Sequence, residues 1–554
     1  MTCPAGRFAA WARAGGVAFA AIGLFCIASV ALGAEPDPGT VSRSDIRHLL
    51  ASPDRLRIAG STLDARALGR FYRARDFAPA WGAGDGGRER AALLLEALAG
   101  AESHGLDPGR YHLEAIRARR SSGSARNATE IELLLTDAFV RYATEIRAGR
   151  RIPGYMEPDW AIVAPRFDAV STLTQALREP ASFAAVLASL PPPAPDYRAL
   201  VAALARYRAL AARGGWPPMP AGTFLRPGDE EGRVTALRAR LAAEDELVSR
   251  RADVRYDDLL AEAVRRFQAR HGLAVDGIVG PETVQALNVP VTDRIQQIVV
   301  NLERWRWLPR ELGRHHIVVN ASDARLYVVA DGRPVLTSRV VVGDLRHPTP
   351  VVQAWVDAVV LHPRWNVPTS IAVEEILPRL RENRRYLAEN DIVVLERRES
   401  DPFGLAIDWA AIPADRFPFR LQQQPGPDNP LGRVKLDIPN RFDVYLHDTP
   451  TRALFSRPVR TASHGCIRVE RADDLAVHVL EDEAQGWTRQ RLADALDAGE
   501  TQRIPLTRPL PVYILYWTAF VEPDGSVQFR ADVYGRDRRL AGALAEGDRG
   551  GRDD

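Results

Sequence analysis

The residue best suited to covalent chemistry is Cys466, which lies in the stretch Ser463-His464-Gly465-Cys466-Ile467-Arg468-Val469. The two other cysteines, Cys3 and Cys26, lie near the N-terminus. His447 precedes Cys466 by 19 positions, which is too far for the two side chains to share one helical face. Two neighbouring strands would instead carry both side chains into one cleft.

A cysteine beside a histidine predicts nucleophilic catalysis. A free cysteine has a pKa of about 8.5, so only a few per cent is thiolate at neutral pH. A histidine within hydrogen-bond reach would raise the reactive fraction and later protonate a leaving amine. We expect the N–H groups of Gly465 and Cys466 to face a developing oxyanion, because glycine lets the backbone approach a carbonyl closely. Arg468, on the same side of a strand as Cys466, is expected to neutralise a carboxylate near the site.

Two other interpretations of Cys466 stay open on the residues alone. A lone cysteine is usually a small buried hydrophobe. A cysteine with two histidines also suits zinc, although these three clustered positions lack a C-x-x-C spacing.

Residues 1–34 are expected to be an export signal. Arg7 and Arg13 precede an apolar run from Gly15 to Leu32, and small residues at its end suit cleavage. The run is long enough for an uncleaved membrane anchor to be the alternative. The exported chain would work in the periplasm with one cysteine and no internal disulfide. An unpaired thiol in an oxidising compartment is a liability unless it is used.

Length and composition indicate several domains and exclude one class of partner. A chain of 554 residues and 61.1 kDa is too long for a single core. The formal net charge of +2 gives no sign of a nucleic-acid partner. Arginine greatly outnumbers lysine, which we attribute to coding bias rather than to function.

Apolar periodicity and turn residues divide the exported chain. We expect a helical scaffold at 35–227, a small helical module at 228–289, a connecting helix at 290–313, a mostly β domain at 314–537 and a mobile tail at 538–554. Strand candidates in the β domain are 316–320, 325–329, 340–343, 355–360, 512–517 and 527–529. A charged helical insertion at 371–419 is interpreted as a lid over the cleft, with a solvated excursion as the alternative.

Three stretches resemble parts of one known family. His447, followed after fifteen residues by Ser463-His464-Gly465-Cys466 and then Arg468, resembles the signature of the L,D-transpeptidase catalytic (YkuD-type) domain. Ala263 to Thr283 resembles a peptidoglycan-binding type 1 domain, and the region of Phe71 to Trp81 resembles the scaffold of the large multidomain members. The resemblance implies a multidomain α+β chain in which two helical domains precede a mostly β sandwich with a helical lid.

The resemblance also implies roles for individual residues. Cys466 would be the nucleophile, His447 the general base, and the backbone carbonyl of Asp448 the group that orients the histidine ring. The remaining candidates would shape the site or contact the substrate: Ser463, His464, Gly465, Tyr445, Arg468, Trp365 and Ser370.

The implied reaction joins peptidoglycan stem peptides. Cys466 would attack a donor tetrapeptide, and the thioester would pass to an acceptor stem to give a 3→3 cross-link without cofactor or metal. Carbapenem-type β-lactams would acylate the same thiol. Two alternatives stay open: an L,D-carboxypeptidase or cross-link hydrolase on the same fold, and a non-catalytic wall-binding protein. The small helical module would bind peptidoglycan or serve only as a spacer.

Overall fold

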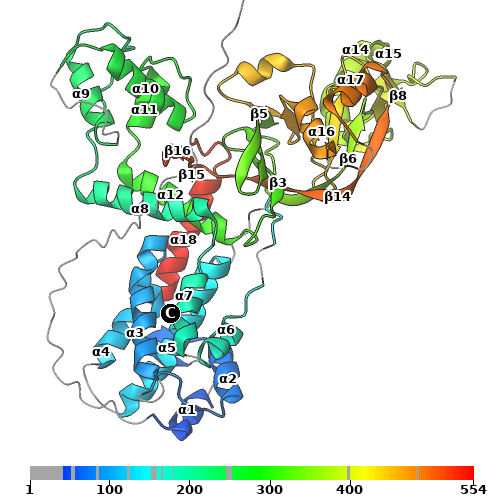
Figure 1. The fold of residues 1–554 in the computed structure, drawn as a ribbon. Helices are drawn as coiled ribbons and strands as arrows, with labels where there is room; N and C mark the ends of the chain where they lie inside the picture. The colour runs from blue at the N-terminus through cyan, green and yellow to red at the C-terminus, as the bar shows by residue number, and fades with distance from the viewer. Residues whose placement is uncertain are drawn as a thin grey trace, which may run out of the picture.

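The computed structural model describes residues 41–553, apart from 52–55, 83–85, 121–124, 151–156, 158, 164–165, 179, 245–252, 396–399, 482 and 484–485. The predicted export signal lies outside the described residues. Figure 1 shows a helical bundle, a smaller helical module and a β domain, with α12 (Val291–Arg306) and α18 (Arg536–Asp553) running where the bundle meets the β domain. None of the described helices combines the length and the apolar character needed to span a bilayer.

The N-terminal bundle packs around a buried carboxylate. Tyr72 donates its hydroxyl hydrogen to Glu132 at 3.0 Å, and the backbone N–H of Trp81 donates to the other oxygen of Glu132 at 3.1 Å. Burial raises the pKa of Glu132. The elements of the bundle are α1 (Arg43–Leu50), β1 (Arg57–Ile58), β2 (Ser61–Thr62), α2 (Ala65–Ala74), α3 (Gly87–Ala99), α4 (Leu113–Arg120), α5 (Ala125–Ala148), α6 (Ala169–Ala176) and α7 (Pro180–Ser189). The next helix, α8 (Pro195–Ala212), packs instead with α12 in the core of the β domain.

The small helical module consists of α9 (Gly232–Leu241), α10 (Asp258–Arg270) and α11 (Pro281–Leu287). Pro281 occupies the first turn of α11, where its missing N–H costs no hydrogen bond. Gln268 of α10 fixes the preceding turn, because its side chain donates to Asp276 at 2.9 Å and accepts the N–H of Gly277 at 2.8 Å. The motif residues of this module therefore hold a turn and a core.

The β domain is built on one nine-stranded sheet in the order β12-β5-β13-β11-β10-β6-β14-β3-β4. β4 also pairs with β5, so the sheet closes on itself. This closed sheet corresponds to the β sandwich that the sequence predicts. The strands are β3 (His315–Asn320), β4 (Arg325–Ala330), β5 (Arg333–Gly343), β6 (Val352–Leu361), β10 (Val434–Asp437), β11 (Leu446–His447), β12 (Thr461–Ser463), β13 (Ile467–Val469) and β14 (Gln502–Leu515). Helices α16 (Ala472–Leu480) and α17 (Arg489–Asp497) and the hairpin β15 (Ala519–Val521)–β16 (Val527–Phe529) complete the domain.

Two of these strands are longer than the sequence predicts. β5 begins at Arg333 rather than at 340, and β14 begins at Gln502 rather than at 512. The added halves are largely exposed and carry proline and arginine, so they lack the apolar alternation that marks a half-buried strand.

The predicted lid segment is a folded unit with its own core. It contains α13 (Thr369–Ile371), the π-helical turn η4 (Ala372–Ile376), α14 (Leu377–Glu382), α15 (Tyr386–Glu389) and β8 (Ile392–Val394). β7 (Trp365–Asn366), β9 (Leu421–Gln423) and β8 form a small sheet. Trp409 lies in the core of this unit and is 1% exposed, so the interpretation as a solvated excursion is wrong.

The predicted mobile tail is a helix, which corrects that prediction. Leu540 and Leu544 of α18 are buried in one cluster with Val300 of α12. The two leucines are spaced i, i+4 and therefore lie on one helical face, within a segment otherwise rich in charge. The C-terminal part of the chain is thus packed against the connecting helix.

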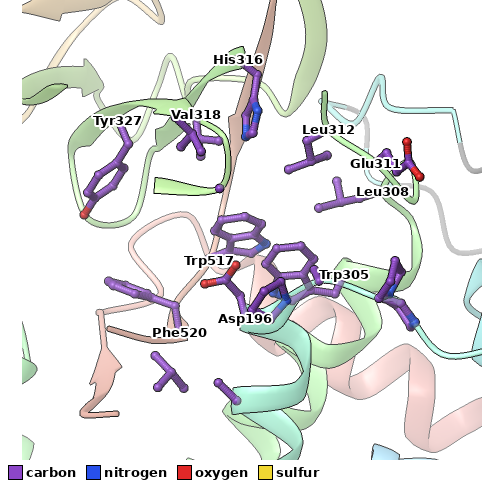
Figure 2. Close-up of a pocket in the computed structure, with 18 of the residues that line it drawn as sticks. Asp196, Trp305, Leu308, Glu311, Leu312, His316, Val318, Tyr327, Trp517 and Phe520 are labelled. Atoms are coloured by element: carbon purple, nitrogen blue, oxygen red, sulfur yellow. The ribbon is translucent and has the colours of Figure 1, made fainter. Parts of the chain in front are cut away.

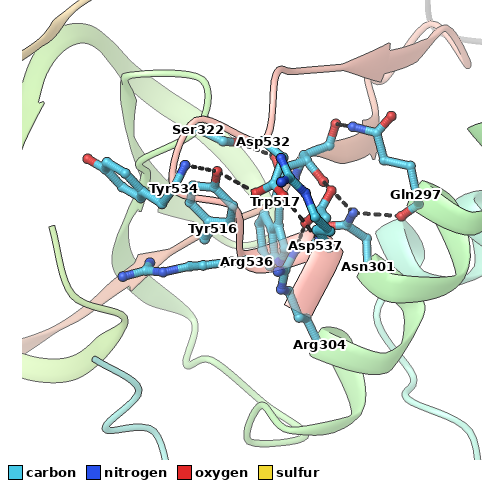
Figure 3. A network of polar contacts seen from close by, with 12 residues as sticks. Gln297, Asn301, Arg304, Ser322, Tyr516, Trp517, Asp532, Tyr534, Arg536 and Asp537 are labelled. Carbon is cyan, nitrogen blue, oxygen red and sulfur yellow. Dashed lines mark hydrogen bonds and ion pairs between the residues drawn. The ribbon is translucent and has the colours of Figure 1, made fainter. Parts of the chain in front are cut away.

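A polar network fixes the start of α18 against α12 (Figure 3). Asn301 accepts the backbone N–H of Thr518 at 3.1 Å, and Arg304 pairs with Asp537 at 2.5 Å. The Thr518 hydroxyl donates to the other oxygen of Asp537 at 2.5 Å. These contacts tie the segment between β14 and β15 to both helices.

A cavity of about 940 Å³ opens where the bundle, the segment after α12 and the sheet meet (Figure 2). Trp305 and Trp517 lie at its base with their rings stacked at 4.5 Å. None of the predicted site residues lines this cavity. It is therefore distinct from the region around Cys466.

The packing of α18 is open to a direct test. Replacing Leu540, which is fully buried, with alanine should lower the free energy of unfolding by about 2–5 kcal/mol, because the change leaves a cavity against Val300. Arg538→Ala, at an exposed position of the same helix, is the matched control and should change stability little. Thermal unfolding and amide exchange across 540–545 measure the effect; equal behaviour of both variants would contradict the packed helix.

Candidate active site

Three neighbouring strands carry the predicted site residues. β11 lies between β10 and β13, antiparallel to β10 and parallel to β13. His447 stands opposite Lys435 on one side and opposite Arg468 on the other. Paired residues share a face of a sheet, and so do residues two apart on a strand. One face therefore holds Lys435, Tyr445, His447, Cys466 and Arg468, while Leu436, Leu446 and Ile467 enter the core on the other.

This register confirms the prediction that neighbouring strands carry His447 and Cys466. Cys466 directly precedes β13, and the Ile467 N–H donates to the Tyr445 carbonyl at 3.1 Å, which continues the parallel pairing. The rings of Tyr445 and His447 lie 5.5 Å apart on the shared face.

The loop that presents Cys466 is closed by Ser463. The Ser463 hydroxyl donates to the Cys466 carbonyl at 2.6 Å and accepts the Gly465 N–H at 3.2 Å. Gly465 has a φ of +101°, a conformation that favours glycine. Its N–H is used within the loop, which corrects the expectation that it faces an oxyanion. Ser463 thus shapes the loop that presents Cys466.

A buried threonine holds the same loop from behind. Thr349 is fully buried, donates its hydroxyl hydrogen to the Gly465 carbonyl at 2.9 Å and accepts the Gly343 N–H at 2.8 Å. The Tyr534 hydroxyl donates to the Gly343 carbonyl at 2.7 Å. The loop that presents Cys466 is therefore connected through β5 to the segment that leads into α18.

His447 is held in one tautomer. Its Nδ1 lies 2.6 Å from the carbonyl oxygen of Asp448, so Nδ1 carries the proton and Nε2 carries the lone pair. Burial, followed by the positive charge of Arg468, lowers the pKa of His447 to about 3, against the opposing effect of the Asp448 carbonyl. The imidazole is therefore neutral at pH 7 and has the protonation state of a base.

The side chain of Asp448 fixes the backbone that orients this ring. Its carboxylate accepts the Arg433 N–H at 2.9 Å and pairs with Arg452 at 2.6 Å. A side chain at Gly432 would lie 2.2 Å from the same carboxylate, so the glycine gives it room. Asp448 thus acts on His447 through its carbonyl, as the resemblance implied.

The Cys466 thiol lies against Tyr445. The Tyr445 phenol interacts electrostatically with the thiol, the Trp365 side chain acts on the same phenol, and the thiol lies 3.9 Å from the Asp443 carbonyl oxygen. Burial raises the pKa of Cys466, while Tyr445, Lys435 and Arg468 act in the opposite direction. Burial therefore favours the protonated thiol at rest, and the three neighbours favour the thiolate.

The other predicted residues divide into two groups. Arg468 and His464 both face the lid segment: His464 Nε2 lies 2.7 Å from Glu375 Oε1, and Glu375 also acts electrostatically on Arg468. Trp365 reaches the site through Tyr445. Ser370 lies exposed in α13, and the described residues show no contact between it and the catalytic pair.

Sequence reasoning missed three residues that the fold brings to the site. Thr349 and Glu375 come from a loop and a helical insertion that carry no motif. Lys435 has a signal in the sequence, because it is the only lysine among 73 lysine and arginine residues. Within the described residues, no group of three or more His, Cys, Asp or Glu side chains is arranged to hold a metal ion.

The geometry is that of a cysteine–histidine site on a sheet, with cations on the same face. Family comparisons agree with it: residues 314–501 match the L,D-transpeptidase catalytic domain (YkuD), 230–287 match a peptidoglycan binding domain, and 66–204 match a scaffold domain. The chain therefore carries a YkuD-family L,D-transpeptidase catalytic domain, joined to a peptidoglycan binding domain and a scaffold domain.

Individual relatives are similar over parts of the chain. A Haemophilus influenzae protein whose name classes it as an L,D-transpeptidase is 35% identical over 245 residues, which are 44% of this chain and 49% of that protein. An N-acetylmuramoyl-L-alanine amidase of Bacillus licheniformis, CwlL, is 43% identical over 67 residues, which are 12% of this chain and 19% of the amidase. The chain thus spans about half the length of the first relative and about a fifth of the second.

One solved structure shows how far the structural likeness reaches. The crystal structure of an L,D-transpeptidase from Xylanimonas cellulosilytica is 18% identical and covers 53% of this chain and 98% of its own. The TM-score between the two structures is 0.17.

The neutral resting site predicts a specific pH dependence. Because burial raises the pKa of Cys466, alkylation by iodoacetamide should still be increasing above pH 8.5, where a free cysteine is about half ionised. Mass spectrometry of the Cys466 peptide gives the rate at each pH, with the denatured protein as the reference. A plateau reached below pH 7 would mean a thiolate–imidazolium pair and would contradict the neutral site.

Thr349 supplies a second test. Thr349→Val keeps the shape of the side chain but leaves the Gly343 N–H and the Gly465 carbonyl without their buried partner, which should cost about 1–3 kcal/mol of stability. Thr349→Ser retains the hydroxyl and is the matched control. Urea unfolding followed by tryptophan fluorescence measures both; a valine variant as stable as the serine variant would show that these hydrogen bonds contribute nothing.

Proposed function

We propose that the protein is an L,D-transpeptidase that forms 3→3 cross-links in peptidoglycan through a thioester on Cys466. The observation that carries the proposal is the placement of Cys466 and His447 on one face of adjacent strands, within the catalytic domain that the family model matches. The peptidoglycan binding domain supports peptidoglycan as the partner.

In the proposed first step, the donor stem acylates the Cys466 sulfur. His447 Nε2 takes the thiol proton as the sulfur attacks the carbonyl carbon of the third residue of a tetrapeptide stem. The Cys466 N–H is the donor that we assign to the oxyanion. The amide bond to the terminal D-alanine breaks, and the imidazolium returns its proton to the leaving amine.

In the second step, the side-chain amine of an acceptor stem attacks the thioester carbonyl. A C–N bond forms, the C–S bond breaks, and the proton lost by the amine returns to the sulfur by way of His447. The energy of the cleaved amide is kept in the thioester, so the reaction needs no cofactor and no metal. The third donor residue is proposed to be meso-diaminopimelate.

The surrounding residues would prepare this reaction rather than perform it. Arg468 would neutralise a substrate carboxylate. The lid segment, which reaches His464 through Glu375, would exclude water and so favour transfer to an amine over hydrolysis. The peptidoglycan binding domain would hold the wall, and the N-terminal signal or anchor would place the enzyme in the periplasm.

The cross-linking proposal is tested on isolated stems. Wild-type protein incubated with tetrapeptide stems should give 3→3 dimers, and Cys466→Ala should give none while its thermal unfolding stays the same. Mass spectrometry of the muropeptides separates the outcomes. Free tripeptide without dimers would assign the hydrolase activity instead, and dimers formed by Cys466→Ala would exclude the mechanism.

Inhibition follows from the same thiol. A strained β-lactam carbonyl acylates a cysteine when an oxyanion donor is ready, and we expect carbapenems to form a stable adduct on Cys466. The adduct should form more slowly in His447→Ala, because the proton acceptor is lost, and removal of the lid at about 371–419 should slow it less. Intact-protein mass spectrometry follows the rate; an adduct that persists in Cys466→Ala would place the nucleophile elsewhere.

A further inference from the structure

Lys435 is an exception in the composition of this chain. Every other basic side chain among the 73 lysine and arginine residues is arginine. We attribute the arginines to coding bias, and the single lysine is therefore an exception to that bias. The position of this residue is β10, next to the strand that carries His447.

Two contacts fix the ammonium group of Lys435. Its Nζ lies 4.4 Å from the centre of the Tyr445 ring and 2.7 Å from Asp437 Oδ1. Both Lys435 and Asp437 are largely buried, with side chains 23% and 22% exposed. A cation over an aromatic face is attracted to the ring, and the attraction increases as water is excluded. The Lys435 ammonium group therefore restrains the Tyr445 ring by packing over one face of that ring.

Tyr445 connects the lysine to the nucleophile. Tyr445 lies beside Cys466 on the shared face, because the Ile467 N–H donates to the Tyr445 carbonyl at 3.1 Å. The phenol of the same ring interacts electrostatically with the thiol, so a displaced ring would weaken that interaction. The positive charge of Lys435 also acts on Cys466 directly, in the direction that favours the thiolate.

We propose that Lys435 is a positioning residue for the Cys466 nucleophile: its ammonium group holds the Tyr445 ring against the thiol and stabilises the thiolate as it forms. The proposal deepens the proposed function and rests on it for the identity of the nucleophile.

The chemistry of the site explains why the residue is lysine. An ammonium group is a compact point charge that fits between one ring and one carboxylate oxygen. The planar guanidinium of arginine is larger and donates in a fixed fork, so it would favour Asp437 in a different geometry or displace the ring. Arg503 already lies 3.4 Å from the second oxygen of Asp437.

Other titratable groups surround the thiol and must stay constant in a test. They come from the elements that pack around the site: Tyr445 directly before β11, His447 on β11, Asp437 on β10, Arg468 on β13, and Glu375 with its partner His464 across the lid contact. A substitution at Lys435 leaves all of them in place.

The test measures the acidity of the thiol and needs no turnover. Lys435→Met keeps the aliphatic stem and removes the charge, so it should move the alkylation profile of Cys466 to higher pH and slow iodoacetamide at pH 8 by about threefold or more. Iodoacetamide is neutral, so the charge of the variant does not attract or repel it. Arg433→Met, directly before the same strand but paired with Asp473 instead, is the matched control and should follow the wild-type profile.

Lys435→Arg separates charge from packing. Its profile should lie between those of the wild type and Lys435→Met, because the charge remains while the guanidinium displaces the ring. A Lys435→Met profile that superimposes on the wild type would overturn the proposal, and so would an equal shift in Arg433→Met or in Lys435→Arg. These outcomes would leave the transpeptidase proposal standing, since that proposal is tested separately by dimer formation in the wild type and its loss in Cys466→Ala.

Discussion

The parallel pairing of β11 with β13 is the contact on which the rest of the site depends. It sets His447 opposite Arg468 and places Cys466 beside Tyr445, while Leu446 and Ile467 enter the core. A slip of one residue would turn every side chain of the site toward the core, because the side-chain period of a strand is two. The apolar residues between the polar ones therefore fix the catalytic geometry, since each must be buried for the polar ones to face the cleft.

Burial of the site makes isolated charges energetically costly, and two features of the structure reduce that cost. The thiol and the imidazole are both neutral at rest, so neither carries an unpaired buried charge. The cations on the same face have partners: Lys435 has Asp437, and Arg468 has the nearby charge of Glu375. The thiolate is favoured only when a proton acceptor and these cations act together, which couples reactivity to the assembled site.

Much of the fold and the centre of the site follow from the sequence, for identifiable reasons. Cys466 and His447 were predictable because a thiol and a base have a limited chemistry and because strand alternation tells which neighbours share a face. The exposed halves of β5 and β14 were not predictable, because pairing with neighbouring strands keeps them extended and no apolar pattern marks them. The helix at 536–553 was misread because two leucines, Leu540 and Leu544, are too few to stand out among charged residues. Thr349 and Glu375 reach the site only through the closed sheet and the insertion, which no local signal specifies.

The central claim is that Cys466 carries the donor stem as a thioester, and trapping that species tests it most directly. The protein is mixed with a tetrapeptide stem whose acceptor amine is blocked, and its intact mass is followed on a short timescale. The account predicts a mass increase equal to the tripeptide acyl group, located on the Cys466 peptide and removed by hydroxylamine. Release of D-alanine without any covalent species on Cys466, or the same adduct on another residue, would contradict it.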